Sequence, residues 1–440
     1  MLFSSITFLY YFLPCVLFLY FIVPQRLKNM VLLISSLFFY AWGEPYYVLF
    51  MLGSICVGYF TGLGIEKYQD TDMTKWILAT SVTLHVVVLF GFKVSESLPI
   101  GISFYTFQVI SYMVDVYRKD VPAQKNVLDF ATYVSMFPQL IAGPIVRYAD
   151  IEKQLKNREH SMENSAYGIR RFVLGLSKKV LLANTLGELC EIFRSSNDKS
   201  ILFYWMYAVA FALHVYFDFS GYSDMAIGLG RMMGFHYQEN FNYPYISKSI
   251  TEFWRRWHIS LGSWFRDYVY IPLGGNRVDK GRYLFNILLV WALTGLWHGG
   301  AWNFVVWGLY FAALLMAEKL WLLNRLERHK VLGHIYAIIT VVIGFVIFDA
   351  NSLNQAWEYI ETMFGFGTVP MISAEAIYYL RSYAIIYVIA ILGATPLVKN
   401  MATRIKKADY FEPILLLGLL LAVTAFLVDG SFNPFLYFRF

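Results

Sequence analysis

Two histidines lie in parts of the chain where an ionisable ring is unexpected. His298 stands in "TGLWHGGAWN", between the apolar runs Leu284–Trp297 and Ala301–Leu322. His258 stands in "ITEFWRRWHISLGSWFRDYVYIPLGGNR", a stretch rich in arginine and tryptophan. An ionisable ring at membrane depth is costly, so His298 is a candidate general base or proton relay. A core histidine that hydrogen-bonds to a neighbouring helix is the structural alternative, and spacing alone leaves both readings of His298 open.

The arginines and tryptophans near His258 permit two interpretations. A basic segment at a cytoplasmic mouth attracts a phosphate-bearing donor such as a coenzyme A or carrier-protein thioester. An interfacial amphipathic helix with an aromatic belt explains the same residues more simply, but it does not explain His258. The candidate donor-binding residues are Arg255, Arg256, Arg266 and Trp257.

Further polar residues punctuate the apolar stretch "HVYFDFSGYSDMAIGLGRMMGF". We interpret them first as contacts between helices and second as the lining of a polar cavity. No GxSxG motif surrounds the serines, which argues against a serine hydrolase. No HExxH or CxxC pattern occurs, so we expect no metal site. The polar residues are Asp218, Ser220, Tyr222, Ser223 and Asp224.

The elements that position these residues are predicted to be membrane helices. The 440 residues are 58% hydrophobic and only 15% charged, whereas a soluble domain carries about a quarter charged residues. Helical spans need about 20 apolar residues, and the chain offers about 11 to 13 such segments, some short or broken. The candidates are Ile6–Val23, Met30–Trp42, Tyr46–Ile65, Trp76–Phe92, Leu98–Val116, Leu128–Val146, Phe172–Cys190, Ile201–Phe217, Leu284–Trp297, Ala301–Leu322, Ile335–Phe348, Ala376–Leu397 and Phe411–Val428.

Basic residues between the runs predict the sides of the membrane. Arg282 precedes the first run of the His298 hairpin and Arg325 follows the second, so both ends are expected in the cytoplasm. His298 lies 16 residues beyond Arg282, about 24 Å along a helix. The hairpin turn is therefore expected deep in the membrane, toward the outer face. Leu128–Val146 contains "FPQLIAGPIVR" and is followed by basic residues, which predicts a re-entrant loop.

Six segments together resemble the membrane-bound O-acyltransferase family (MBOAT), in its bacterial alginate O-acetyltransferase branch. They run from one end of the chain to the other, in the family's order. The segments are "PIGISFYTFQVISYMVDVYR", "FPQLIAGPIVR", "DFSGYSDMAIGLGRMMGF", "FWRRWHISLGSWFRDYVYIPLGG", "LTGLWHGGAWNFVVWG" and "FLYFRF".

The resemblance implies an all-α polytopic fold around a tunnel or funnel. We expect a single domain over residues 1–440, located in the cell membrane. The resemblance also implies that His298 is the essential catalytic histidine and that His258 is the second active-site histidine, nearer the cytoplasm. The acyl donor is a cytoplasmic thioester, with acetyl-CoA as the first candidate and a carrier-protein thioester as the alternative. No tightly bound cofactor is expected. The acceptor is an extracytoplasmic polysaccharide, reached with an SGNH-type partner outside the membrane.

The sequence is also compatible with three other functions. Transfer of D-alanine to teichoic acid belongs to a related branch with the same general architecture. A proton-coupled transporter also has broken helices and buried histidines, although the sequence shows no internal repeat. A scaffold for polysaccharide assembly needs neither histidine. Nucleic-acid binding is not expected, since the net charge of +6 comes from short basic segments between apolar runs.

Overall fold

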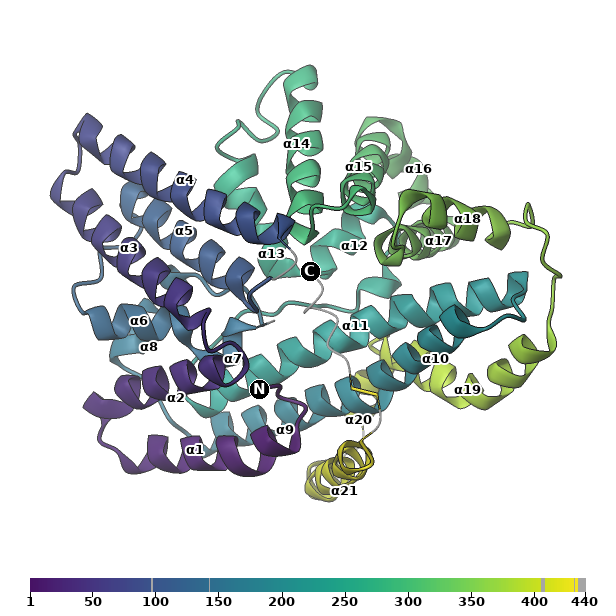
Figure 1. The fold of residues 1–440 in the computed structure, drawn as a ribbon, viewed down its shortest axis with the longest axis horizontal. Coiled ribbons are helices and arrows are strands. Elements are labelled where there is room, and N and C mark those ends of the chain that lie inside the picture. The colour runs from purple at the N-terminus through teal and green to yellow at the C-terminus, as the bar shows by residue number, and fades with distance from the viewer. Residues whose placement is uncertain (96–97, 142, 405–407, 431, 434–440) are drawn as a thin grey trace. The chain divides into compact units, whose positions relative to one another are not determined.

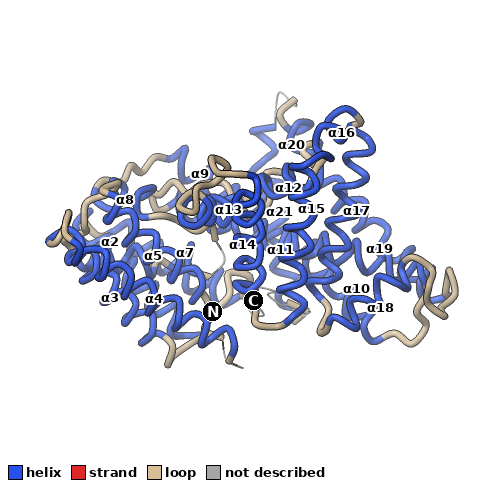
Figure 2. The backbone as a smooth tube through the Cα atoms, turned by 90° about the horizontal axis from the view of Figure 1, so that it is seen from above, coloured by secondary structure: helices blue, strands red, loops and turns tan. Residues whose placement is uncertain are grey.

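The apolar runs form helices in the computed structural model, and no strand occurs among the residues it describes (Figure 2). The described residues are 1–95, 98–141, 143–404, 408–430 and 432–433. The terminal "FLYFRF" and one residue of "FPQLIAGPIVR" therefore lie outside them. The chain divides into two compact units. The single domain expected over residues 1–440 stays a prediction.

The first unit comprises Met1–Leu176 and Tyr222–Glu239. Within it, α3, α4 and α5 contact one another and lie side by side (Figure 1). α2 packs against α6, and α1 against α2. The helices of this unit are α1 (Leu13–Ile22), α2 (Lys28–Gly43), α3 (Val48–Lys67), α4 (Asp72–Val94), α5 (Ile102–Arg118), α6 (Val127–Ser135), α7 (Phe137–Leu140), α8 (Tyr148–Lys156) and α9 (Met162–Ser177), with short turns at Phe8–Phe12 (η1) and Gln25–Leu27 (η2).

The segment expected to be re-entrant is broken in the structure. Its helix stops at Ser135, restarts as the four-residue α7 at Phe137, and is not continued beyond Leu140. Pro138 lies in the first turn of α7, where a proline has no backbone donor to lose. The described residues from Phe130 to Val146 are buried, as non-helical backbone at membrane depth requires. The re-entrant path itself stays a prediction.

The second unit comprises Ser177–Gly221 and the described chain from Asn240 onward. Residues of the long helix α11 (Ile201–Met232) are divided between the two units. The other elements of the second unit are η3 (Lys178–Ala183), α10 (Asn184–Ser195), η4 (Pro244–Ile246), α12 (Ile250–Arg256), α13 (Ile259–Phe265), η5 (Arg266–Tyr270), α14 (Lys280–His298), α15 (Trp302–Ala317), η6 (Glu318–Leu322), α16 (Leu323–Arg328), α17 (Lys330–Asp349), α18 (Leu353–Met363), α19 (Ala374–Gly393), α20 (Leu397–Ala402) and α21 (Ala408–Val428).

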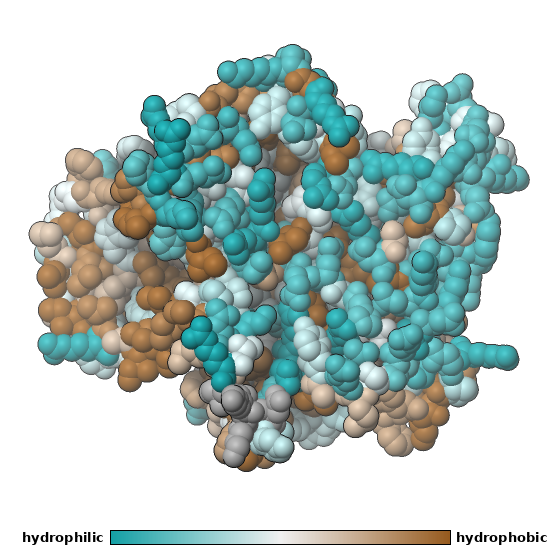
Figure 3. Space-filling model, turned by 180° about the vertical axis from the view of Figure 1, so that it is seen from behind, coloured by the Kyte–Doolittle hydropathy of each residue, from teal (hydrophilic) through white to brown (hydrophobic). Residues whose placement is uncertain are grey.

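Seven helices of the described chain are long and apolar enough to cross a membrane. Helices whose outer faces meet lipid leave large apolar side chains exposed, and α19 and α21 do so along most of their length. From behind, Figure 3 shows hydrophobic and hydrophilic side chains gathered in separate areas of the surface. The chain is thus an all-α polytopic membrane protein. The seven spans are Val48–Lys67, Asp72–Val94, Ile201–Met232, Trp302–Arg328, Lys330–Asp349, Ala374–Gly393 and Tyr410–Val428.

α14 and α15 form the hairpin that carries His298 (Figure 1). Asp279 caps the start of α14, where its carboxylate accepts a hydrogen bond from the Arg282 N–H at 3.1 Å. Two glycines allow the helices to touch backbone to backbone. A side chain on Gly295 would meet the Phe304 carbonyl, and one on Gly308 would meet the Trp291 carbonyl.

We expect Gly308→Val to destabilise the protein by about 1–3 kcal/mol, since the added methyl groups force the two backbones apart. Thermal unfolding in detergent measures the change. Gly418→Val is the matched control, because a side chain at this position of α21 meets no atom within 4 Å. Equal unfolding temperatures for the two variants would contradict the close packing of the hairpin.

Candidate functional site

His298 is the last residue of α14 and lies in an aromatic enclosure. Its ring meets the rings of Trp307 and Phe348 edge-on, with centroids 5.1 and 5.0 Å away and interplanar angles of 83° and 85°. Trp297 covers a further side at 4.7 Å. Only 9% of the His298 surface is exposed. Aromatic walls of this kind fix the orientation of the imidazole and limit access by water.

His258 lies between two short helices, in a backbone conformation that few side chains adopt. It follows α12 and caps α13 with φ 45° and ψ 55°, in the left-handed region. Non-glycine residues held there are strained and concentrate at functional sites. The residue is 4% exposed, and Phe219 packs edge-on against its ring with centroids 4.6 Å apart.

Hydrogen bonds hold the start of α12, the helix that precedes His258, in place. The Glu318 carboxylate accepts hydrogen bonds from the N–H groups of Ile250 at 2.6 Å and Thr251 at 2.8 Å. Ser249 Oγ accepts another from the Glu252 N–H at 3.0 Å. These contacts satisfy N–H groups that a helix N-terminus leaves open, and the negative charge suits that end of the helix.

Asn240 sets the tautomer of His258. Its Oδ1 lies 3.0 Å from His258 Nδ1 and also accepts hydrogen bonds from the backbone N–H and the hydroxyl of Ser260, at 3.3 and 2.9 Å. A backbone N–H can only donate, so the Asn240 atom at this point is the oxygen. His258 Nδ1 therefore carries the proton, and Nε2 keeps a lone pair. That nitrogen is buried, with no hydrogen-bond partner in the described part of the chain.

Both histidines contact one tryptophan. The Trp297 ring lies 4.7 Å from that of His298 and 6.3 Å from that of His258. The sequence places them 40 residues apart with no spacing that relates them. The fold brings them together because the ring of Trp297, next to His298 at the end of α14, packs against His258 between α12 and α13. One site therefore contains both predicted catalytic residues.

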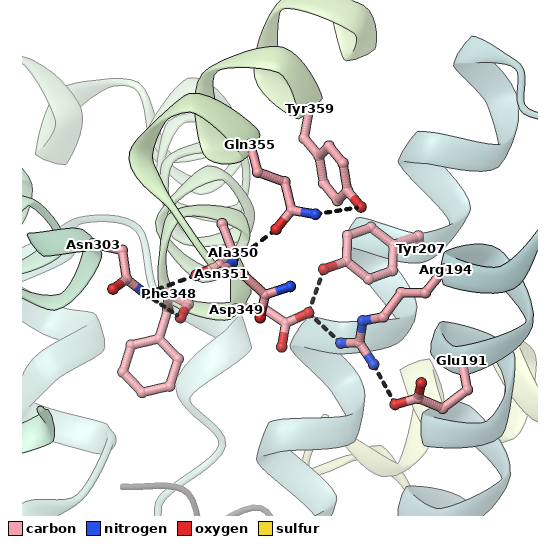
Figure 4. Close-up of polar contacts among 10 residues, drawn as sticks. All are labelled: Glu191, Arg194, Tyr207, Asn303, Phe348, Asp349, Ala350, Asn351, Gln355 and Tyr359. Atoms are coloured by element: carbon pink, nitrogen blue, oxygen red, sulfur yellow. Dashed lines mark hydrogen bonds and ion pairs between the residues drawn. The ribbon is translucent and has the colours of Figure 1, made fainter. Parts of the chain in front are cut away.

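A polar network holds the end of α17, which carries Phe348 of the His298 enclosure (Figure 4). The Asn303 side-chain amide donates to the carbonyls of Phe348 at 3.2 Å and Ala350 at 2.9 Å, at the C-terminal end of α17. Between them, the Asp349 carboxylate accepts from the Tyr207 hydroxyl and from Arg194. The backbone that carries Phe348 is thereby held from both sides.

Two of these site residues were not predicted from the sequence. Asn303 closes the motif "TGLWHGGAWN", so its proximity to His298 was a usable signal. Asn240 stands 18 residues before His258 in an irregular stretch, and nothing in the spacing points to it. Its importance follows only from the three donors that meet at its oxygen.

Of the predicted donor-binding arginines, Arg255 and Arg266 are exposed and Arg256 is half-buried, and they differ in their ion pairing. Arg256 forms an ion pair with Glu252 at 2.9 Å, and Arg266 with Asp267 at 2.6 Å. Arg255 is exposed and forms no ion pair within the described residues. Arg255 is thus the arginine whose charge is most available to an anionic ligand, and binding by all three stays a prediction.

Trp257, the fourth predicted donor-binding residue, belongs to the core of the second unit. Its ring stacks on Phe253 at 5.5 Å and contacts Phe241 at 5.1 Å and Phe345 at 5.2 Å. It is 6% exposed. This packing supports the α12–α13 corner directly, and contact with a donor stays a prediction.

Two of the five polar residues of α11, Asp218 and Asp224, make contacts between helical segments, as their first interpretation predicts. In the second unit, Asp218 pairs with Lys179 of η3 at 2.7 Å, with both side chains 1% exposed. In the first unit, Asp224 pairs with Arg171 of α9 at 2.8 Å. Among the described residues, no three His, Cys, Asp or Glu side chains lie together as a metal site.

Burial lowers the pKa of His258 from 6.5 to about 3. The folded protein therefore keeps the ring neutral, whereas the unfolded chain takes up a proton below pH 6.5. The stability due to the neutral ring is complete above pH 6.5 and is lost as the pH falls toward 3. Between pH 7 and pH 5 we expect a loss of about 2 kcal/mol.

Thermal unfolding at pH 7 and pH 5 measures this loss. His258→Gln keeps an N–H donor for Asn240 but cannot titrate, so its unfolding temperature should fall less between the two pH values. An equal fall in both proteins would show that other groups cause the acid sensitivity.

The fold and the site define a class: a multi-pass membrane enzyme with two buried histidines on a shared tryptophan. The chain belongs to the membrane-bound O-acyltransferase family, whose model matches residues 119–355, including both histidines. It is therefore an acyltransferase of the cell membrane and uses an acyl donor.

The chain is similar to three relatives that are named for different substrates. The probable alginate O-acetylase AlgI of Pseudomonas aeruginosa is 43% identical over 84% of this chain and 76% of its own. The peptidoglycan O-acetyltransferase of Helicobacter pylori is 32% identical over 86% of this chain and 82% of its own. The teichoic acid D-alanyltransferase of Streptococcus thermophilus is 27% identical over 66% of this chain and 80% of its own.

Proposed function

We propose that the protein transfers an acetyl group from a cytoplasmic thioester, acetyl-CoA, across the membrane to hydroxyl groups of an extracytoplasmic polysaccharide. The observation that carries the proposal is the pair of buried histidines on Trp297, in a chain of this family. The similarity to O-acetylases of alginate and peptidoglycan supports acetyl over D-alanyl as the transferred group.

In the reaction, His298 is the general base. It takes the proton of the attacking hydroxyl as the oxygen bonds to the thioester carbonyl carbon. The C–S bond then breaks, and the proton passes to the departing thiolate. The partial negative charge at the C-terminus of α14 stabilises the imidazolium formed in between. The attacking hydroxyl belongs to the polysaccharide or to a serine of an SGNH-type partner that completes the transfer.

His258 has a different role, because its ring stays neutral. With Nδ1–H bound to Asn240, Nε2 accepts a hydrogen bond or passes on a proton, without contributing a fixed charge. Arg255, Arg256 and Arg266 hold the phosphates of the donor at the cytoplasmic side. The aromatic side chains around His298 exclude water that would otherwise hydrolyse the thioester.

The decisive experiment measures donor and product together. A deletion strain that carries the wild-type gene or His298→Gln is assayed for O-acetyl groups on its surface polysaccharide. Purified protein is supplied in parallel with radiolabelled acetyl-CoA or a D-alanyl carrier-protein thioester, together with the candidate partner and polymer. Acetylation that depends on acetyl-CoA and His298 supports the proposal. Consumption of the D-alanyl thioester alone, or solute uptake without thioester consumption, would overturn it.

A further inference from the structure

A cluster of basic side chains belongs to the first unit, whereas both histidines of the site belong to the second. Lys28 begins α2, and Arg158 and His160 follow α8. Lys28 Nζ lies 3.4 Å from His160 Nε2 and 4.7 Å from the centre of the Tyr20 ring. Arg158 lies 5.7 Å from the same ring. The three basic groups thus surround one tyrosine, and we call them the Tyr20 cluster.

The Tyr20 cluster has no direct counter-ion. None of its three basic side chains forms an ion pair with a carboxylate in the described part of the chain. Asp129 is connected only through Asn29, which donates to it at 2.7 Å and accepts from Arg158. Buried cations are normally paired, so this excess of positive charge calls for an anion.

Hydrogen bonding in the Tyr20 cluster is also incomplete. Arg158 is only 8% exposed, yet its Nε and Nη1 have no hydrogen-bond partner among the described residues. The Tyr20 hydroxyl donates its one proton to the Met233 carbonyl at 2.6 Å, so it can only accept from His160 Nε2 at 3.0 Å. His160 Nε2 is then a donor and cannot accept from Lys28, whose ammonium is left with open donor sites.

Apolar surface adjoins the Tyr20 cluster. On α1, Phe18 and Ile22 are 67% and 65% exposed, and Ile34 of α2 is 60% exposed. The exposed Phe21 contacts both the Lys28 ammonium, 5.5 Å from its ring centre, and the His160 ring at 5.8 Å. Basic groups next to an exposed apolar helix face are suited to bind a phospholipid. The basic groups would contact its phosphate, and its acyl chains would lie along the helices.

We propose that the Tyr20 cluster binds the phosphate headgroup of an anionic phospholipid. The headgroup reaches the site at the exposed His160, and Lys28 supplies most of the positive charge that binds it. Arg158 supports the site from behind, stacked against Phe235 at 4.7 Å. The exposed apolar faces of α1 and α2 favour a lipid over free phosphate. The residues of this site belong to the first unit, and those of the proposed acyl-transfer site to the second.

Native mass spectrometry and thermal unfolding test the proposal on the full-length protein. Phosphatidylglycerol, phosphatidylcholine and inorganic phosphate are added separately to the detergent-solubilised protein. Phosphatidylglycerol should remain bound and raise the unfolding temperature, whereas the other two should do neither. Lys28→Gln should weaken phosphatidylglycerol binding about fivefold, the expected effect of one basic side chain near a membrane surface. His160→Gln, at an exposed position, should weaken it as well without disturbing the fold.

Lys67→Gln is the matched control, because Lys67 is likewise a terminal residue of a helix, the last of α3, and lies 5.2 Å from a tyrosine ring, but is exposed. It should retain wild-type binding. Equal retention of phosphatidylglycerol by Lys28→Gln, His160→Gln and the wild type would overturn the site. Stabilisation by inorganic phosphate equal to that by phosphatidylglycerol would overturn the assignment to a lipid.

Discussion

His298→Gln should lower the rate of acetyl transfer by about 10²–10⁴-fold, the usual contribution of a general base. Glutamine fills much of the space between Trp307 and Phe348, so the hairpin should remain folded. The loss should appear in kcat, because the histidine acts on the reacting hydroxyl. Thioester turnover by purified protein, with the candidate partner and acceptor, measures it.

His334→Gln is the control for this experiment. His334 is a half-buried histidine of α17 whose Nδ1 lies 3.0 Å from the Ser247 carbonyl. It has no part in the proposed reaction, so its variant should turn over at close to the wild-type rate. A folded His298→Gln protein with wild-type turnover would contradict the catalytic role.

Removal of either partner of the Lys179–Asp218 pair should destabilise the protein by about 3–5 kcal/mol. The Lys179 ammonium and the Asp218 carboxylate are 2.7 Å apart, and each side chain is 1% exposed. Lys179→Met leaves a buried carboxylate, and Asp218→Leu leaves a buried ammonium, each without its opposite charge. Unfolding in detergent, followed by fluorescence, measures both losses.

The double variant Lys179→Met/Asp218→Leu removes both charges and should recover most of the lost stability. Asp72→Asn is the control. Lys75 and Asp72 form an ion pair of similar length, 2.8 Å, but their side chains are 68% and 86% exposed. The control variant should change stability by less than about 1 kcal/mol. Additive losses in the double variant would contradict a coupled buried pair.

Much of the architecture could be predicted from the apolar runs and from the glycines and prolines that interrupt them. Leu284–Trp297 and Ala301–Leu322 lie within the hairpin of α14 and α15 with its continuation in η6, and the glycines after His298 separate the helices. The prolines and glycine of "FPQLIAGPIVR" indicated the break at α7. Such local signals work because a span must satisfy its own backbone. The sides on which the loops lie remain predictions.

The contacts that define the site were less predictable, since they join residues far apart in the chain. Asp218 was interpreted as a contact between helices, but its partner Lys179 stands within an apolar run, where no pattern singles it out. The meeting of His258 and His298 at Trp297 likewise depends on tertiary packing. Family resemblance assigned roles to both histidines, and the geometry adds that Asn240 determines which nitrogen of His258 is open.

The link between Asn303 and the end of α17 bears on how this scaffold can be engineered. Asn303 offers two N–H donors to two carbonyls that differ by two positions in the chain. Aspartate has the same shape but would set a negative oxygen against both acceptors. An inserted residue between Phe348 and Ala350 would shift one carbonyl out of register with the amide. The short loop between α17 and α18 is therefore a poor place to insert a new segment intended to change the acceptor specificity.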